Sequence, residues 1–266
     1  MMDIKELNIS IFSYNIFWKI MKNNNSPLEK NFGFTKLQKL KLNIISNIKN
    51  VINYYNPFIY CFQEAESAHS IIELFSKSEY RYHLGYSEPE HILTIWRKDV
   101  IKKKKVIDGE FEPGRPFSII IFNDLRYNNY LMLINIHASH HHNTYSRIFE
   151  PIQKIIDLNK NEILKYDIKR IIMVGDFNRD IGSQIKIAPT EYRLKINLIE
   201  YNFYPIENTT NKTCCSLSGW GYKLNYDQLI DTYKSPLLIH QLNKEPWYVS
   251  ESSDHLATLS LVKNFI

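Results

Sequence analysis

The sequence predicts an α/β protein, with a mixed sheet architecture and helices outside it. Helical and strand-like patterns alternate at both ends of the chain, whereas the middle is mostly strand-like. The 266 residues fit one large domain, 1–266, which would bury roughly 70 to 75% of its unfolded surface. A hydrophobic content of 44% and a charged content of 23% argue against a disordered or fibrous chain.

The first third of the chain alternates strand and helix. Leu7 to Ile16 has the two-residue period of a strand, with Asn15 at its far end. Thr35 is the expected cap of a helix whose apolar residues recur at helical spacing up to Ile52. The next predicted elements are a buried strand that ends at Gln63 and Glu64 and a short helix, over Phe58 to Phe62 and Ile71 to Phe75.

The remaining elements are predicted from shorter patterns. Apolar residues at helical spacing predict one helix from Tyr145 to Tyr166, and a turn beginning at Gly175-Asp176 ends the strand that follows it. The predicted strands are Ile92 to Arg97, Phe117 to Phe122, Tyr130 to His137, Ile171 to Val174, Leu224 to Ile230 and Leu256 to Val262.

Charge, cysteine content and hydropathy restrict the class of protein. The net charge of +5 and the pI near 8.8 favour polyanionic partners. Cys61, Cys214 and Cys215 give no disulfide framework, which fits a reducing compartment. Neither a signal peptide nor a transmembrane segment is evident. We therefore expect an intracellular monomer, in the cytoplasm or nucleus, without stable membrane insertion or an obligate protein partner.

Polar residues stand where the predicted apolar strands end. Any one of them alone fits a solvated loop, but strand ends present side chains to a shared cleft. Carboxylate and amide oxygens suit magnesium, calcium or manganese. A histidine beside a carboxylate suits general base chemistry on a phosphodiester, because imidazole titrates near neutral pH. The residues are Asn15, Glu64, His137, Asp176, Asn178, Asp254 and His255.

Five motifs in this order resemble the endonuclease/exonuclease/phosphatase superfamily, typified by deoxyribonuclease I. The nearest matches in motif are deoxyribonuclease I itself and the nuclease subunit of the cytolethal distending toxins. The matching segments are Ser13-Tyr14-Asn15-Ile16, Phe62-Gln63-Glu64-Ala65, Ile134-Asn135-Ile136-His137-Ala138-Ser139, Gly175-Asp176-Phe177-Asn178-Arg179-Asp180 and Ser253-Asp254-His255. The resemblance implies a four-layer α/β/β/α sandwich of two mainly antiparallel sheets packed face to face, with the active site at one end.

The resemblance also implies a metal site and a phosphate site. Glu64 would bind Mg²⁺, with Mn²⁺ or Ca²⁺ as alternatives, and Asn15 would assist it. Asp254 would be a second metal or water ligand. Asp176 and Asn178 would position the scissile phosphate and the attacking water.

The two histidines would carry the acid–base chemistry. His255 would act as general base or contact the phosphate, and His137 would protonate the leaving oxygen. Asp227 would orient His255 and Glu90 would orient His137, because a carboxylate behind a histidine fixes its tautomer.

Two arginines are candidates for binding the substrate phosphate. Gly114-Arg115-Pro116 resembles the arginine-proline element before the histidine strand of deoxyribonuclease I, and Arg179 lies in the motif shared with the toxin nuclease. For Arg115, the alternative is a surface arginine in a turn.

These features together predict a magnesium-dependent phosphodiesterase that hydrolyses nucleic acid, foremost a DNA endonuclease with a two-histidine mechanism. The same machinery serves phosphoinositide phosphatases, sphingomyelinase-type lipid phosphodiesterases and deadenylase-like RNA nucleases, and these stay open. A scaffold protein that had lost catalysis is disfavoured, because each expected motif is intact. The sequence does not distinguish DNA, RNA and phospholipid substrates, endo from exo action, or the number of metals.

Overall fold

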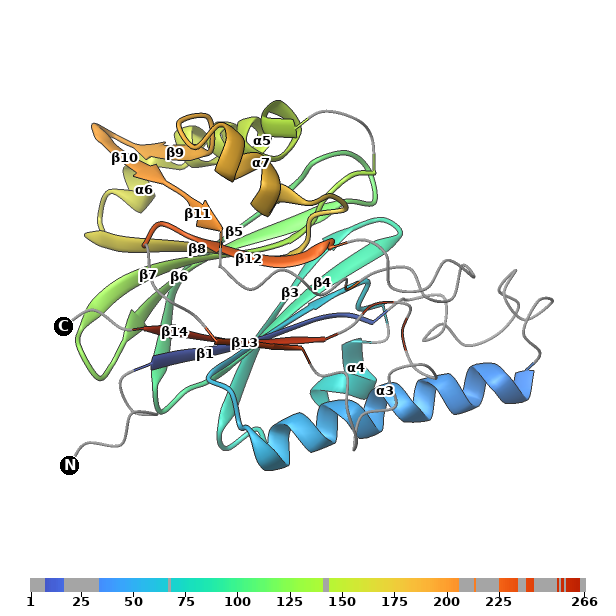
Figure 1. Ribbon diagram of the computed structural model, residues 1–266. Helices are drawn as coiled ribbons and strands as arrows, with labels where there is room; N and C mark the ends of the chain where they lie inside the picture. The colour runs from blue at the N-terminus through green and yellow to red at the C-terminus, as the bar shows by residue number, and fades with distance from the viewer. Residues whose placement is uncertain are drawn as a thin grey trace.

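Two sheets packed face to face, with helices on both outer faces, form the molecule (Figure 1). The computed structural model describes residues 8–16, 34–66, 68–140, 144–205, 213, 225–233, 238–241, 253, 255 and 257–263. Within these ranges each of the two sheets has six strands. The predicted four-layer α/β sandwich is therefore confirmed.

The first sheet contains both ends of the described chain. Its strands are β1 (Asn8–Asn15), β2 (Ile59–Gln63), β3 (Tyr80–Ser87), β4 (Glu90–Arg97), β13 (Leu238–Gln241) and β14 (Thr258–Lys263). Their order across the sheet is β13-β14-β1-β2-β4-β3. β1 and β2 run parallel, and the other neighbours pair antiparallel.

The second sheet is built from the middle of the chain. Its strands are β5 (Ile101–Glu110), β6 (Pro116–Asp124), β7 (Asn129–His137), β8 (Ile168–Asp176), β11 (Tyr204–Pro205) and β12 (Asp227–Asp231). Their order is β11-β12-β8-β7-β6-β5, and only β7 and β8 run parallel among the described pairs. β9 (Arg193–Ile196) and β10 (Ile199–Asn202) form a separate antiparallel hairpin.

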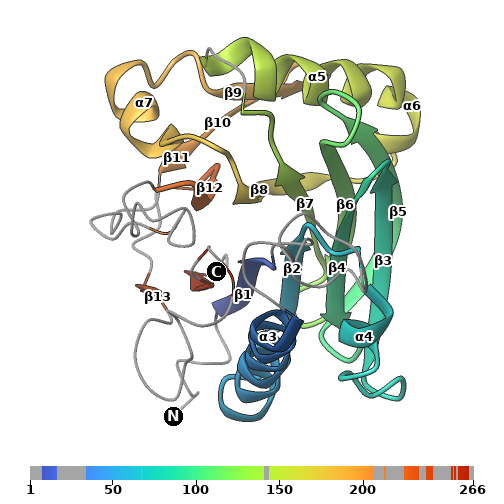
Figure 2. The same cartoon turned by 90° about the vertical axis from the view of Figure 1, so that its right-hand side faces the viewer.

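Helices cover the outer face of each sheet (Figure 2). α3 (Phe34–Tyr54) and α4 (Ala68–Ile72) lie on the first sheet, and α5 (Thr144–Leu158), α6 (Lys160–Ile163) and α7 (Ile181–Ile187) lie on the second. α3 packs through Leu40, Ile44, Ile48 and Val51, which recur at helical spacing and are buried. Burying such a side chain contributes roughly 1.5 to 3 kcal/mol. Among the described helices, none is long and apolar enough to cross a membrane.

The space between the sheets is filled by apolar side chains from both inner faces. Ile11 and Trp96 from the first sheet meet Phe122 and Val174 from the second in one buried cluster. Trp96 and Phe122 pack edge to face, with ring centroids 5.2 Å apart. This core holds the sheets in a fixed relation, which is the condition for side chains from both to form one site.

The predicted elements are found with shifted ends and several omissions. α3 begins at Phe34, so Thr35 lies in the first turn instead of capping it. The helix predicted over Ile71 to Phe75 is α4, shifted toward the N-terminus. The single helix predicted from Tyr145 to Tyr166 is wrong: it divides at Asn159, whose side-chain amide donates to Ile155 O at 2.9 Å and satisfies a carbonyl at the helix end.

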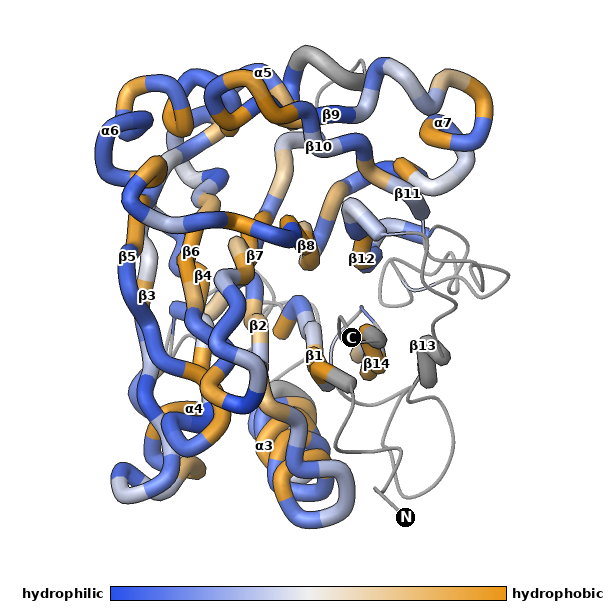
Figure 3. Tube along the Cα trace, turned by 90° about the vertical axis from the view of Figure 1, so that its left-hand side faces the viewer, coloured by the Kyte–Doolittle hydropathy of each residue, from blue (hydrophilic) through white to orange (hydrophobic). Residues whose placement is uncertain are grey.

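The edge strands β3, β5, β11 and β13 were not predicted, nor was the hairpin of β9 and β10. Lysines occupy 102 to 105 of β5, so no apolar alternation shows in the sequence, and β5 is mostly hydrophilic in Figure 3. Lysines on an edge strand also hinder pairing with other chains. The short helix α7 was missed too, because its seven residues carry too weak a periodic pattern.

Candidate active site

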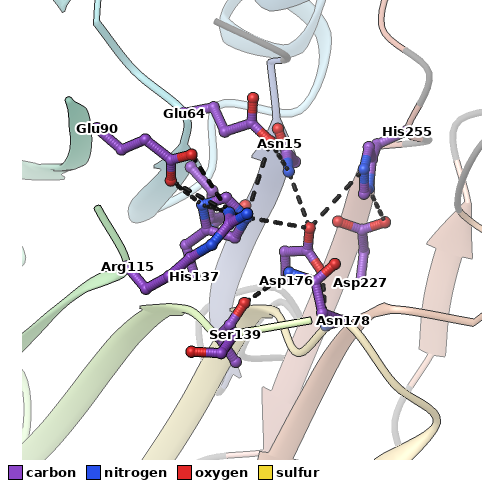
Figure 4. A network of polar contacts seen from close by, with 12 residues as sticks. Asn15, Glu64, Glu90, Arg115, His137, Ser139, Asp176, Asn178, Asp227 and His255 are labelled. Carbon is purple, nitrogen blue, oxygen red and sulfur yellow. Dashed lines mark hydrogen bonds and ion pairs between the residues drawn. The ribbon is translucent and has the colours of Figure 1, made fainter. Parts of the chain in front are cut away.

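Four strands bring polar side chains to one end of the sandwich. Asn15 ends β1, Glu64 directly follows β2, His137 ends β7 and Asp176 ends β8. β1 pairs parallel with β2, and β7 with β8, so each pair of strands ends at the same edge of its sheet. The core between the sheets places the two edges against each other, and the side chains meet there (Figure 4).

Asn15 connects the two sheets at this end. Its Nδ2 donates to Glu64 Oε1 at 3.1 Å and to Asp176 Oδ2 at 2.9 Å. Asn15 and Asp176 are buried. Glu64 adopts a φ of 52°, in the left-handed region that a glutamate rarely enters. Strain of this kind persists only where the surroundings impose it, and it is concentrated at functional sites.

Glu90 and His137 form the first histidine–carboxylate pair, one residue from each sheet. His137 Nδ1 lies 2.6 Å from Glu90 Oε2, and Nε2 lies 3.7 Å from Glu64 Oε1 and 3.6 Å from Asp176 Oδ2. Burial acts to lower the pKa of His137, but the hydrogen bond with Glu90 and the charges of Glu64 and Asp176 outweigh it. The pKa of His137 is therefore raised, and its protonated form is stabilised.

Arg115 lies against this first pair. Its Nη1 is 3.3 Å from both carboxylate oxygens of Glu90 and 2.6 Å from His137 Nε2. A protonated His137 has no lone pair for this donor, so the arginine and the imidazolium repel each other at that contact. Glu90 thus holds the guanidinium next to His137 Nε2, the ring nitrogen that faces Glu64 and Asp176.

Asp227 and His255 form the second pair. His255 Nδ1 lies 2.8 Å from Asp227 Oδ2, and His255 Nε2 lies 3.7 Å from Asp176 Oδ2. Asp227 is the first residue of β12 and pairs with Asp176 across the sheet. Burial raises the pKa of Asp227 to about 6, against the opposing effect of His255.

Asp176 is the residue that both histidines face. Burial acts to raise the pKa of Asp176, but His255, His137 and hydrogen bonds from Asn178 N and Asn15 lower it below its usual value. Its Oδ1 accepts from Asn178 N at 2.7 Å. A carboxylate with these donors stays ionised at neutral pH.

The turn at Asn178 lies directly beside Asp176 in the site. Asn178 has a φ of 52°, a left-handed conformation that asparagine tolerates. Its Nδ2 donates to Ala138 O at 2.6 Å, and Arg179 Nη2 donates to Ser139 O at 3.3 Å. Both predicted residues of this turn therefore lie against the segment that follows His137.

Several supporting residues were not singled out from the sequence. Ser253 Oγ donates to Asn15 O at 2.7 Å and accepts from His255 N at 3.1 Å, so it fixes the segment that carries His255. Thr213 Oγ accepts from Asp227 N at 2.9 Å. Only the serine had a sequence signal, as the first residue of its motif.

Gly175 and Gln63 make close contacts beneath the site, the first within the second sheet and the second between the two sheets. Gly175 has a φ of 135°, and a Cβ there would lie 2.2 Å from Ile136 O. No side chain fits between β7 and β8 at this point. Gln63 Nε2 donates to Asn135 Oδ1 at 2.8 Å, which joins the two sheets by a buried polar bond.

The donor atoms fit a hard divalent cation. Glu64 is a carboxylate at the site whose pKa is raised by burial, so its charge would be stabilised by a nearby positive ion. The Asn15 amide carries an oxygen of the kind that magnesium and calcium bind, although in this structure its Nδ2 faces Glu64 and Asp176, so the amide would have to turn over to bind a cation. A second group with donor atoms within 4.8 Å of one another consists of Asp176, Asp227 and His255, but the second pair already uses His255 Nδ1. Asp254 lies outside the described residues.

Comparison with solved structures identifies the fold. The chain resembles truncated Caenorhabditis elegans TDP2 with a TM-score of 0.63 and 16% identity, covering 98% of this chain and 99% of that one. It resembles an endonuclease/exonuclease/phosphatase from Bacteroides vulgatus with a TM-score of 0.66 and 13% identity, covering 97% and 99%. The chain has the endonuclease/exonuclease/phosphatase fold. The fold expected from the five motifs is thereby confirmed.

A further solved structure shares the endonuclease/exonuclease/phosphatase fold. ANGEL2, described as a 2',3'-cyclic phosphatase, matches with a TM-score of 0.66 and 15% identity, covering 96% of this chain and 95% of that one. No protein-family model and no curated protein sequence matches the chain. The likeness therefore concerns the fold, and the chemistry has to be argued from the site.

Proposed function

We propose that this protein is a divalent-metal-dependent phosphodiesterase of nucleic acids, with DNA as its foremost substrate. The observation that carries the proposal is the convergence of two histidine–carboxylate pairs on one carboxylate oxygen. His137 Nε2 and His255 Nε2 lie 3.6 Å and 3.7 Å from Asp176 Oδ2, and they approach it from different sides (Figure 4). Hydrolysis by water needs one group to accept a proton and another to supply one.

In this proposal the second pair is the base. The bond to Asp227 places the hydrogen of neutral His255 on Nδ1 and leaves the Nε2 lone pair facing the site. The attacking water forms the new P–O bond as its proton passes to Nε2. The negative charge of Asp227 then stabilises the imidazolium that results.

The first pair is the acid. The raised pKa of His137 favours the protonated ring, and Glu90 holds the proton on Nδ1. As the bond from phosphorus to the leaving oxygen breaks, the Nε2 proton passes to that oxygen. In the hydrolytic step one water is consumed, and protons pass from water to His255 and from His137 to the product. The enzyme is restored when His255 releases its proton and His137 takes one up from solvent.

Glu64 and Asn15 would hold the divalent cation, as the hard oxygen donors of the site. When bound, the cation would polarise the phosphate and stabilise the charge that develops on it. Asp176 and Asn178 would orient the attacking water and the phosphate beside it.

Arg115 and Arg179 would bind the substrate phosphate. The charge repulsion between Arg115 and a protonated His137 supports this role, because an anion entering the site gives the guanidinium a better partner. In doing so, Arg115 would leave His137 Nε2 open to the leaving oxygen.

Nucleic acid is preferred over a lipid substrate on charge. The chain carries +5 at pH 7, and cationic proteins gain affinity for polyphosphate chains. A second candidate, hydrolysis of RNA phosphoesters, is favoured by the structural likeness to ANGEL2, named as a 2',3'-cyclic phosphatase.

The test is a substrate screen of the purified protein with Mg²⁺ and with EDTA. We expect Mg²⁺-dependent nicking of supercoiled plasmid, loss of that activity in EDTA and its return on adding Mg²⁺ or Mn²⁺. RNA, a 2',3'-cyclic nucleotide, phosphoinositide and sphingomyelin vesicles are the other arms. Hydrolysis of a lipid without nicking would contradict the proposal, and cleavage of RNA alone would establish the second candidate. Asp176→Asn, checked for native circular dichroism, controls for a contaminating nuclease.

A further inference from the structure

The outer face of β3 carries exposed aromatic side chains toward the active-site end of the sandwich. Tyr82 and Tyr86 are 51% and 55% exposed, and Leu84 lies between them on the same face. In the ladder with β4, Tyr82 pairs with Ile95, Leu84 with Leu93 and Tyr86 with His91. Tyr82, Leu84, Tyr86 and His91 are called here the β3 aromatic face. Figure 2 shows β3 at the outer edge of its sheet.

One end of the β3 aromatic face lies at the same end of the first sheet as the catalytic groups, but on its helix-covered face. Tyr86 pairs with His91, whereas the neighbouring Glu90 reaches His137 from the inner face of the sheet. Tyr86 and His91 pack ring on ring, with centroids 4.9 Å apart and planes tilted by 39°. Ala65 N donates to His91 O at 2.9 Å, so the residue after Glu64 is bonded to the strand that carries this pair. Strands lie about 4.8 Å apart. The backbone of Tyr86 is therefore about two strand spacings, or roughly 10 Å, from that of Glu64.

The other end opens into a cavity of about 400 Å³. Tyr82, Tyr80 and Phe75 supply aromatic walls, and Lys77 and Arg81 supply positive charge. Arg81 Nη1 donates to Lys77 O at 2.6 Å and Tyr80 O at 2.8 Å, which holds the guanidinium beside the rings. Aromatic faces together with cations are the combination that binds bases and phosphates of single strands.

We infer that the β3 aromatic face and its cavity bind a single-stranded segment of the nucleic-acid substrate, next to the scissile phosphate. Tyr86 would stack on a base near the reacting bond, and Tyr82 on a base farther along. Four residues separate the two rings, about 13 Å at the strand rise. This length holds about four nucleotides at the duplex rise of 3.4 Å, and fewer in a stretched strand. The inference rests on the proposed function.

The chemistry favours an unpaired strand over a duplex. A stacking surface needs exposed base faces, which a duplex hides in its own stack. The charges are unevenly placed: Lys77 and Arg81 lie at the cavity end, whereas Glu88 contacts Tyr86 at the active-site end. Phosphate binding is thus expected at the cavity end, and base stacking without a phosphate contact is expected at the active-site end.

The test is equilibrium binding of fluorescein-labelled oligothymidine and oligouridine in EDTA, followed by anisotropy. Tyr82→Ala and Tyr86→Ala should each weaken binding by roughly 5- to 100-fold, the range for losing one stacked base. Tyr82→Phe and Tyr86→Phe, which keep the ring, should bind within twofold of the unchanged protein. Tyr54→Ala is the matched control, because Tyr54 is 74% exposed on α3 and does not line the cavity.

Separate readouts distinguish the outcomes. Hydrolysis of bis(4-nitrophenyl) phosphate, which has no base, should be unchanged in Tyr82→Ala and Tyr86→Ala. Unaltered oligonucleotide binding by these variants would overturn the inference, as would an equal loss for a matched duplex or in the Tyr→Phe variants. Oligonucleotide binding that depends on the β3 aromatic face, without hydrolysis of any phosphodiester, would instead contradict the proposed function alone. Failure of the unchanged protein to bind either oligonucleotide would overturn the inference directly.

Discussion

The two histidine–carboxylate pairs of the site have the same geometry in different surroundings. In each, a histidine Nδ1 meets a carboxylate and Nε2 faces Asp176. His137 belongs to the second sheet and Glu90 to the first. His255 lies just before β14 of the first sheet, and Asp227 belongs to the second sheet. Both pairs therefore exist only because the two sheets are packed against each other.

The difference lies in the charges around each histidine. Glu64 and Asp176 lie within 3.7 Å of His137 Nε2 in addition to its own carboxylate, and together they raise its pKa. In the second pair burial raises the pKa of Asp227 itself. The first pair thus favours a proton on its imidazole, which agrees with the acid role proposed for His137, while the base role of His255 rests on the proposal.

The largest expected effect is the loss of activity when either histidine is replaced. The leaving group of the substrate should show which histidine is the acid and which is the base. His255→Ala should lower kcat by roughly 10²- to 10⁴-fold on both plasmid DNA and bis(4-nitrophenyl) phosphate. His137→Ala should lose as much on DNA but less than tenfold on the activated diester, because nitrophenolate leaves without protonation. Parallel kcat measurements on the two substrates check this. The reverse pattern would exchange the roles of the two histidines.

A smaller effect is expected from the carboxylates. Asp227→Asn and Glu90→Gln should each reduce kcat by roughly 10- to 100-fold, since they orient the histidines without touching substrate. Thermal denaturation of both variants serves as the control for folding. A full kcat for either variant on DNA would show that its histidine is oriented by other groups.

The pH profile should distinguish the same two variants. Activity needs protonated His137, so it is present below the raised pKa of that group and lost as pH rises through it. Glu90→Gln removes a charge that raises this pKa, and the alkaline limb of kcat should move to lower pH. Asp227→Asn should leave the alkaline limb in place. A shift of that limb in Asp227→Asn but not in Glu90→Gln would contradict the assignment.

The smallest effect concerns Arg115, which belongs to the first pair only. Arg115→Lys keeps the charge but loses the planar fork, so KM for DNA should rise by several-fold with a smaller change in kcat. KM and kcat on plasmid DNA give the measurement. Arg193→Lys is a control far from the site, since this exposed arginine pairs with Glu200. An unchanged KM would remove Arg115 from the phosphate site.

The candidate site could be predicted to a large extent because its signals are local. Asn15, Glu64, His137 and Asp176 stand at the ends of apolar runs that are strands in the structure. Their positions follow from short-range patterning, in which a change from apolar to polar residues marks the end of a buried strand. The roles assigned to them stay predictions until activity is measured.

The edge strands and the residues that support the site by hydrogen bonds could not be predicted in the same way. β5 is stabilised by pairing with β6, and its lysines hide the strand pattern. Thr213 acts through a bond to Asp227, 14 residues along the chain, and Ser253, although it belongs to a motif, through a bond to Asn15 at the other end of the chain. Such contacts have no short-range signature, since they depend on which segments the fold brings together.

The sequence by itself predicted the helices and strands of an α/β protein and the polar residues at the strand ends, and its five ordered motifs implied the four-layer sandwich, since apolar periodicity and motifs are properties of contiguous residues. Only the tertiary structure decided how they combine. It placed Arg115 on the Glu90–His137 pair, directed two histidines at Asp176 and aligned Tyr82 with Tyr86 on an edge strand. These relations depend on long-range sheet packing, whose geometry is set by the whole core.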